Sequence, residues 1–212
     1  MVESRLFVTT EELRFPWFRA YRRQLMMATV PLAFAAVIFR RAWPVTPQLS
    51  MTLTIIGVVA IIIGALVRLL AAKEILNRKK IVVVKTGIYS STRNPLYFGN
   101  FIAGLGLAAI AQSLTLLALV FFVYVPVYFL VILHEERRLL GMHGDVYGQY
   151  LTEAPRFFPR LFGKRRRGST MPWDSRLLKR EIPNMAGLFA AALALKGCHQ
   201  LQEMLNLPGF FP

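Results

Sequence analysis

The chain has little of what stabilises a small secreted or metal-binding domain. Its single cysteine, Cys198, excludes an internal disulfide and any cysteine-based zinc site. Acidic residues are scarce, with 11 Asp and Glu against 26 Lys and Arg. From Asn94 to Leu133 there is no charged side chain at all. With 55% hydrophobic and 17% charged residues, the composition favours a small protein with several membrane spans over an ordinary soluble domain.

The uncharged run from Asn94 to Leu133 is too long for one span. At about 1.5 Å per residue, a single helix over it would be roughly 60 Å long, twice a hydrocarbon core. Gln112-Ser113 is the natural break, so we predict a hairpin of two spanning helices at about residues 95–111 and 114–133. Because a hairpin returns to the side it left, its two ends are expected at one membrane surface.

Two earlier apolar runs predict spans at about residues 24–41 and 49–70. Lys and Arg are concentrated in the N-terminus, between Arg68 and Arg93, and in residues 134–180. Since basic residues accumulate on the cytoplasmic side of a membrane, this distribution predicts four spans with both termini in the cytoplasm. The expected fold class is all-α: a polytopic membrane helix bundle of about four transmembrane helices with a helical hairpin.

We divide the chain into an interfacial N-terminus (1–23), a membrane core (24–159) and a basic cytoplasmic tail (160–212). The N-terminal residues lack the leading apolar core of a cleavable signal peptide, and with the small size this favours a prokaryotic inner membrane. Residues 185–195 form a short apolar stretch, which is expected to be an amphipathic helix on the cytoplasmic surface.

The formal charge of +15 would also suit nucleic acid. However, the basic residues flank apolar spans, as they do in proteins that contact anionic lipids. We therefore expect the tail, with its run Lys164–Arg167, to bind anionic lipids, and we expect no nucleic-acid partner.

The two ends of the hairpin carry groups of opposite charge. Asn94-Pro95 is a favourable helix start, so free N–H groups and a positive dipole end are expected beside Arg93. Glu135 and Glu136 follow the other end. A ligand with an anionic and a cationic group can be held between them. Taken singly, each residue also has a structural explanation: Arg93 as a membrane-boundary marker and the glutamates as the start of a solvated helix.

Two motifs flank the hairpin. The first is Gly87-Ile88-Tyr89, Arg93-Asn94-Pro95-Leu96-Tyr97 and Gly99; it resembles the G-x-Y-x-x-x-R-H/N-P-x-Y-x-G signature of membrane methyltransferases. The second is Glu135-Glu136, Leu139, Gly144, Tyr147, Tyr150 and Pro155-Arg156-Phe157-x-Pro159; it is similar to E-E-x-x-L-x-x-x-F-G-x-x-Y-x-x-Y with a closing P-R-F-x-P. Both belong to the isoprenylcysteine carboxyl methyltransferase and phospholipid methyltransferase group. The resemblance covers about Val82 to Pro159.

The resemblance implies S-adenosylmethionine-dependent methyl transfer, with the cofactor bound by a cytoplasmic C-terminal segment. The acceptor would be a membrane lipid or lipidated small molecule, a phospholipid head group or prenyl-type lipid, that enters from the bilayer. The catalytic residues would be Arg93, Glu135 and Glu136, and no metal is expected. Residues expected at the cofactor are Val83, Val84, Gly87, Tyr89, Arg93, Asn94, Pro95, Tyr97, His134, Glu135, Glu136 and Tyr147.

The chemistry of the cofactor agrees with this set. Its carboxylate suits Arg93 and the helix start, its amino group and ribose hydroxyls suit glutamates, and its sulfonium suits aromatic faces such as Tyr89 and Tyr97. The backbone near Gly87 can approach the cofactor closely because glycine has no side chain.

The chain departs from the prenylcysteine enzymes at Asn94, Ile81 and His143, where that family tends to have His, His and Phe; this speaks against a prenylcysteine acceptor. A carboxylate or phosphate acceptor needs no base, whereas an amine or thiol must lose a proton, for which Glu135, Glu136, His134 and His143 are the candidates. Two other classes stay open: a sterol-type reductase that uses NADPH, and a non-catalytic membrane scaffold.

Overall fold

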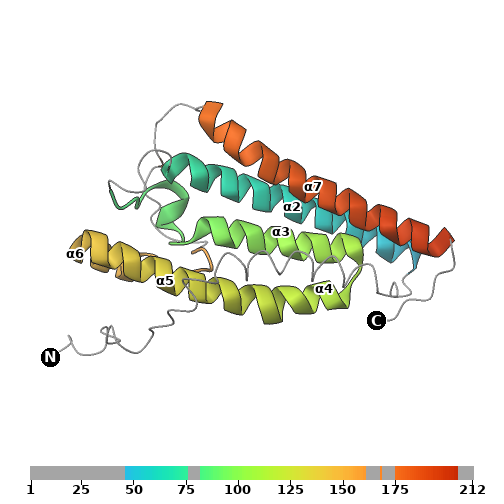
Figure 1. The fold of residues 1–212 in the computed structure, drawn as a ribbon, viewed down its shortest axis with the longest axis horizontal. Helices are drawn as coiled ribbons and strands as arrows, with labels where there is room; N and C mark the ends of the chain where they lie inside the picture. The colour runs from blue at the N-terminus through green and yellow to red at the C-terminus, as the bar shows by residue number, and fades with distance from the viewer. Residues whose placement is uncertain (1–45, 76–81, 161–167, 169–174, 205–212) are drawn as a thin grey trace.

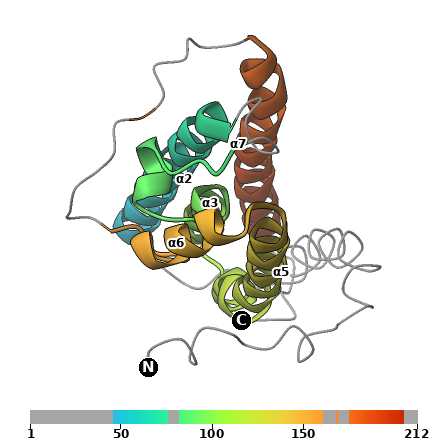
Figure 2. The ribbon, with the colours of Figure 1, turned by 90° about the vertical axis from the view of Figure 1, so that its left-hand side faces the viewer.

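The computed structural model describes residues 46–75, 82–160, 168 and 175–204, and this part of the chain is helical without a strand. Its long helices lie side by side (Figure 1). They are α2 (Pro47–Ile75), α3 (Pro95–Ala111), a continuous helix made of α4 (Leu114–Leu119), η3 (Val120–Tyr124) and α5 (Val125–His143), and α7 (Ser175–Met204). The short helices η2 (Gly87–Ser90) and α6 (Asp145–Glu153) lie together at one end of this bundle (Figures 1 and 2). We call it the α6 end.

The predicted hairpin is present as two helices, of which the 17-residue α3 is shorter than the helices that can cross a membrane. Its turn marks the opposite end of the bundle. Helix α3 ends at Ala111, and Gln112 takes a left-handed conformation with φ of 50°. The Ser113 side chain then accepts a hydrogen bond from the Leu116 backbone N–H and caps α4. Because the chain turns here, α5 runs back to the α6 end, where α3 begins (Figure 1). We call the opposite end the turn end.

Helices α2 and α3 touch through two pairs of glycines. A Cβ added at Gly106 would lie 2.6 Å from the carbonyl oxygen of Gly57, and one added at Gly99 would lie 2.7 Å from that of Gly64. Each pair also clashes in the reverse direction. Small residues let membrane helices approach this closely, so Gly99 and Gly106 serve the packing of α3 against α2.

Two helices in the described residues are long and apolar enough to cross a membrane: Pro47–Ile75 and the continuous Leu114–His143. Large apolar side chains stay exposed on both, among them Ile56 and Ile63 on α2 and Phe122 on η3. Contiguous apolar surface of this kind is rare on soluble monomers and suits contact with lipid. The span predicted at about residues 24–41 lies outside the described residues.

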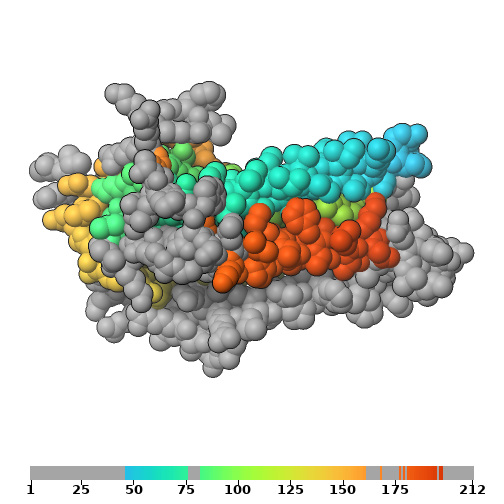
Figure 3. Space-filling view, turned by 90° about the horizontal axis from the view of Figure 1, so that it is seen from above, coloured from blue at the N-terminus to red at the C-terminus, as the bar shows by residue number. Residues whose placement is uncertain are grey.

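Helix α7 differs from the prediction for the tail. It begins at Ser175, ten residues before the apolar stretch 185–195, and Pro183 lies inside it. It runs along α2 and α3 (Figures 1 and 3). The charges of Arg180 and Glu181 interrupt the apolar pattern in the sequence. In the structure Glu181 is neutralised by Arg68 of α2, so the helix continues through it.

Candidate active site

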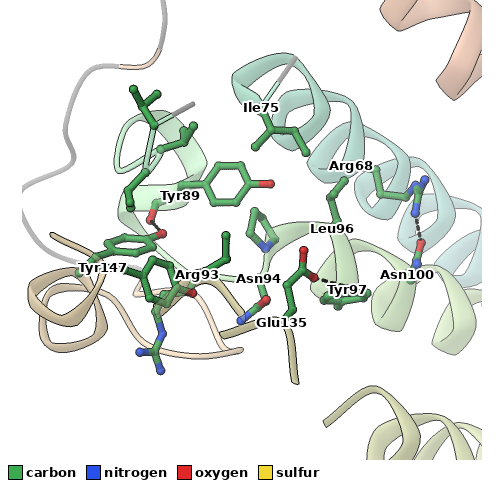
Figure 4. Close-up of a pocket in the computed structure, with 16 residues that line it drawn as sticks. Arg68, Ile75, Tyr89, Arg93, Asn94, Leu96, Tyr97, Asn100, Glu135 and Tyr147 are labelled. Atoms are coloured by element: carbon green, nitrogen blue, oxygen red, sulfur yellow. Dashed lines mark hydrogen bonds between the residues drawn. The ribbon is translucent and has the colours of Figure 1, made fainter. Parts of the chain in front are cut away.

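A cavity of about 210 Å³ lies at the α6 end, where the two motifs meet (Figure 4). This volume is below the roughly 300–1,000 Å³ of typical small-molecule sites, so the cavity has room for one small ligand or for one part of a larger one. It is lined by Arg68, Ile75, Val82, Val83, Val84, Tyr89, Arg93, Asn94, Pro95, Leu96, Tyr97, Asn100, Glu135, Leu139, Tyr147 and Tyr150.

One half of the cavity is aromatic and aliphatic. The Tyr89 ring of η2 points into the cavity (Figure 4), Tyr147 and Tyr150 of α6 line it too, and the segment Val82–Val84 completes this wall. The hydroxyl of Tyr150 donates a hydrogen bond to the backbone carbonyl of Tyr89 at 2.7 Å, which fixes α6 against η2. Burial raises the pKa of the Tyr89, Tyr147 and Tyr150 hydroxyls above the ordinary value for tyrosine, so all three are neutral near pH 7.

The centre of the cavity is acidic. Glu135 of α5 directs its carboxylate into the space between the aromatic wall and α3 (Figure 4). The Tyr97 hydroxyl, from the first turn of α3, donates a hydrogen bond to Glu135 Oε2 at 2.9 Å. The Tyr97 ring in turn packs edge-on against Tyr128, at 5.3 Å between centroids. The carboxylate therefore has a defined direction, which suits binding of a cationic or hydroxyl group.

The neighbouring Glu136 points elsewhere and is buried. Its Oε1 lies 3.2 Å from Arg93 Nε, and its Oε2 lies 3.0 Å from Arg156 Nε. The Asn94 side-chain amide also donates to Oε1, at 3.3 Å. Arg93 Nη1 donates to the carbonyl of Leu151 at 3.0 Å, so this guanidinium is held by one ion pair and one hydrogen bond. Arg93, Asn94 and Glu136 together join both ends of the hairpin at the cavity.

The Pro155–Pro159 segment of the second motif is held by the Arg-Asn-Pro segment. The Arg93 backbone N–H donates to Pro155 O at 2.9 Å, and the Asn94 side chain donates to Arg156 O at 2.9 Å. The Thr92 hydroxyl donates to Phe157 O at 2.9 Å. Asn94 is the N-cap residue of α3, as predicted, but its side chain makes no capping hydrogen bond because it is used in these contacts.

Gly87 supports the aromatic wall from behind. It has φ of +58°, a left-handed conformation that favours glycine, and a Cβ there would collide with the carboxylate of Glu74. The Thr86 hydroxyl donates to Glu74 Oε2 at 3.0 Å. Glycine is therefore required at this position by the packing of η2 against the end of α2.

Arg68 and Asn100 form the other end of the cavity, away from Tyr89 and Tyr147 (Figure 4). Arg68 Nη1 donates to Asn100 Oδ1, and Arg68 Nη2 lies 2.9 Å from Glu181 Oε2 of α7. The sequence reasoning missed these two lining residues. The signal was present in Arg68, an arginine placed between the apolar run of α2 and Leu69-Leu70, because ionisable residues within membrane helices are often functional.

Nine of the twelve residues expected at the cofactor line the cavity: Val83, Val84, Tyr89, Arg93, Asn94, Pro95, Tyr97, Glu135 and Tyr147. Gly87 and Glu136 lie behind its wall, and His134 is not among the lining residues. Within the described residues, no group of three or more His, Cys, Asp or Glu side chains is placed to hold a metal ion.

Residues 51–149 match the phospholipid methyltransferase family. A similar protein is the nickel-cobalt-cadmium resistance protein NccN of Alcaligenes xylosoxydans xylosoxydans, 35% identical over 113 residues, which are 53% of this chain and 53% of that protein. Another is the cobalt-zinc-cadmium resistance protein CzcN of Cupriavidus metallidurans, 33% identical over 144 residues, 66% of this chain and 65% of that protein. The matches thus span only about half to just under two thirds of these relatives. No solved structure matches the chain.

The matched segment contains nearly all of α2, the hairpin and all of α6 up to Gln149. It therefore includes every lining residue of the cavity except Tyr150. Over residues 51–149 the chain is similar to the phospholipid methyltransferase family, the group that its two motifs also resemble.

Proposed function

We propose that this protein is an integral membrane methyltransferase that uses S-adenosylmethionine and acts on a lipidic acceptor. The observation that carries the proposal is the cavity at the α6 end, which is lined by residues of both motifs and lies where α2, α3 and α5 converge. The active site would face the cytoplasm, since the basic segments that flank the cavity follow the positive-inside rule.

The lining residues fit this cofactor. The rings of Tyr89, Tyr147 and Tyr150 and the aliphatic wall suit an adenine base, and Glu135 suits an amino group or ribose hydroxyls. The first turn of α3 would receive the carboxylate, because its N–H groups have no partner within the helix. Arg93, which is engaged with Glu136 and Leu151, would add its charge beside that turn and hold the turn in place.

When bound, S-adenosylmethionine supplies an electrophilic methyl group on a sulfonium. The chain's own task is to align the acceptor, exclude water and stabilise charge. Tyr97 holds the Glu135 carboxylate in one direction, and tyrosine faces around it stabilise a cation. For an amine or thiol acceptor, Glu135 is the group in the cavity that can take the proton; a carboxylate or phosphate acceptor needs none.

The acceptor is proposed to enter from the bilayer. The cavity has room for one ligand part, so the acceptor must approach from outside the space that the cofactor fills. The surrounding helices α2 and α5 expose large apolar side chains, including Leu70 and Phe129, which suit contact with acyl or prenyl chains. The basic run Lys164–Arg167, outside the described residues, would bind anionic lipid head groups.

Both relatives are named for resistance to metals. For this chain we propose methyl transfer to a membrane component as the underlying activity, because the cavity and the family match support that chemistry. A change in membrane lipid caused by methylation would be one way in which such a protein contributes to resistance.

The test is calorimetric titration of the detergent-purified protein with S-adenosylhomocysteine, with NADPH titrated in parallel. We expect saturable binding of the first and none of the second. The Glu135→Gln variant should lose binding, whereas Glu153→Gln, a matched change at an exposed residue of α6 outside the cavity, should retain it. Binding of NADPH alone would indicate a reductase, and a folded protein that binds neither would overturn the proposal.

A further inference from the structure

Helix α7 runs antiparallel to α2 and is tied to it near both ends. Near the α6 end, Arg68 Nη2 of α2 lies 2.9 Å from Glu181 Oε2. Near the turn end, Lys196 Nζ donates a hydrogen bond to Thr54 Oγ1 at 3.2 Å. The two helices therefore lie side by side over the same length of the bundle (Figures 1 and 3).

The face of α7 that meets the bundle is continuous. Glu181, Leu188, Ala192 and Lys196 are spaced by seven, four and four residues, which places them on one stripe of a helix. Ala192 is buried in a cluster with Ile61 of α2 and Ile110 of α3, and Leu188 packs against it. The helix is thus docked along α2 and α3 by side-chain packing as well as by its two polar contacts.

The neighbouring face of α7, about 100° around the helix, is apolar too. Ile182, Phe189 and Leu193 are exposed, Leu193 at 75% of its surface. Between Ile182 and Leu195 the only polar side chain is Asn184. A helix that lies in the plane of a membrane surface needs a polar face, and this stretch has none. In contact with the hydrocarbon chains of lipid, these exposed apolar side chains would be in a favourable environment.

The apolar stretch of α7 is shorter than that of its neighbour. Residues 182–195 of α7 extend about 21 Å, whereas the uncharged run of α2, residues 47–67, extends about 31 Å. A stretch shorter than the hydrocarbon core can still span it when a flanking lysine snorkels and the charge at the other end is neutralised. Lys196 and the Arg68–Glu181 pair meet these two conditions.

We propose that α7 crosses the bilayer beside α2. We also propose that its Glu181 is a positioning residue, which holds Arg68 at the end of the cavity that Arg68 and Asn100 form. The crossing places the end of α7 on the membrane surface opposite the cavity, unlike the cytoplasmic tail expected from the sequence. The role in turnover rests on the proposed function; the crossing of the membrane does not.

Because both side chains are buried, Arg68 depends on the Glu181 carboxylate to keep its position. The two side chains are only 14% and 4% exposed, and Asn100 accepts a second hydrogen bond from the guanidinium. Removing the carboxylate would leave a positive charge in a low-dielectric place, so Arg68 would turn towards water or lipid head groups. The end of the cavity formed by Arg68 and Asn100 would then lose this positively charged side chain.

The crossing is tested with three cysteine probes in a Cys198→Ser background. Gly141, Gly187 and Gly197 are exposed glycines where an added Cβ would meet no atom within 4 Å. They stand at the α6 end of α5, in the middle of α7 and at its turn end. A membrane-impermeant maleimide should modify Gly141→Cys and Gly197→Cys from opposite sides, and Gly187→Cys only after detergent is added. Modification of the first two from the same side, or rapid modification of Gly187→Cys in intact membranes, would overturn the crossing.

The positioning role is tested by comparing Glu181→Gln with Lys196→Gln, since each removes one polar contact between α7 and α2. With tritiated S-adenosylmethionine and native membrane lipids, we expect turnover to fall about tenfold or more in Glu181→Gln alone. The affinity for S-adenosylhomocysteine should stay within about twofold of wild type, and Glu181→Asp should restore part of the turnover. Equal losses in the two glutamine variants, or none in Glu181→Gln, would overturn the role. A wild-type protein that lacks turnover and cofactor binding would instead refute the proposed function, and the cysteine result would stand.

Discussion

Glu135 and Glu136 are adjacent in sequence but have different environments. Successive residues on a helix point about 100° apart, so one carboxylate faces the cavity and the next faces the interior behind it. Glu135 is bound by Tyr97 and open to a ligand, whereas Glu136 is surrounded by Arg93, Arg156 and Asn94. The two residues that the motif presents as a pair therefore have separable roles.

Replacing Glu136 with Gln should destabilise the protein. The change leaves Arg93, which is buried, without its carboxylate, and loss of one partner of a buried ion pair costs about 3 kcal/mol or more. Thermal unfolding in detergent should show a clear fall in Tm for Glu136→Gln and little change for Glu135→Gln. If the two variants unfold at the same temperature, the distinction between a cavity residue and a supporting residue is wrong.

Replacing Tyr150 with Phe should loosen α6. The buried hydroxyl donates to the backbone carbonyl of Tyr89, and its removal leaves that acceptor unpaired at a cost of about 1 kcal/mol. The expected result is a modest fall in Tm together with weaker binding of S-adenosylhomocysteine, because η2 and α6 form the aromatic wall. Unchanged values of both would show that the contact does not fix this wall.

The same tyrosine predicts a dependence of stability on alkaline pH. Burial raises the pKa of Tyr150 in the folded protein, whereas in the unfolded chain a tyrosine ionises near pH 10. Above about pH 10 the unfolded state therefore binds fewer protons than the folded state, and stability falls as pH rises. Thermal unfolding between about pH 9 and 11 should show a shallower fall for Tyr150→Phe than for wild type; parallel curves would contradict this account.

At the level of elements, the close contact between α2 and α3 depends on glycines, which have no side chain. Gly106→Ala would place a methyl group 2.6 Å from the backbone carbonyl oxygen of Gly57, which cannot move without shifting the helix. Overpacking of this kind costs about 1–3 kcal/mol, so Tm should fall. Gly104→Ala is the matched control, since its Cβ would meet only Val120 Cγ2 at 3.4 Å. Equal effects of the two changes would show that close approach of α2 and α3 is not what the glycines provide.

The continuous helix from Leu114 to His143 contains an irregular element. Val120–Tyr124 form a wider turn just before Pro126, whose ring nitrogen has no proton to donate. Such turns let a helix pass a proline. Here the irregularity lies where the Tyr124 hydroxyl donates to the backbone carbonyl of Tyr97 at 3.0 Å, so η3 is joined to α3 at the residue that orients Glu135.

At the scale of the whole molecule, the hairpin was predictable because one property determines it. An uncharged run twice the length of a span, with a polar break at Gln112-Ser113, has few other solutions in a membrane. The contact between Tyr97 and Glu135 follows from that geometry, because a hairpin brings its two ends together. The sequence predicted this meeting of the ends but not the individual hydrogen bond. The turn of Glu136 away from the cavity was not, because spacing along a helix does not say which face meets which partner.

The role of Arg68 and the length of α7 could not be predicted from the sequence. Glu181 and Arg68 are far apart in the chain, and each taken alone marks the end of an apolar run. Only their pairing in three dimensions neutralises both charges and allows α7 to extend along α2. The same limit applies to the Pro155–Pro159 segment: its motif was recognised, but its support of the Arg-Asn-Pro segment depends on backbone hydrogen bonds that side-chain patterns do not reveal.

The most direct test of the account is transfer of a labelled methyl group. Membranes that contain the protein would be incubated with tritiated S-adenosylmethionine and extracted with organic solvent, alongside membranes with Glu135→Gln and with the exposed control Glu153→Gln. The account predicts label in the organic phase for wild type and Glu153→Gln, and background for Glu135→Gln. Equal label with and without the Glu135 carboxylate, or no label above empty membranes from a folded protein that binds S-adenosylhomocysteine, would contradict methyl transfer to a lipid at this site.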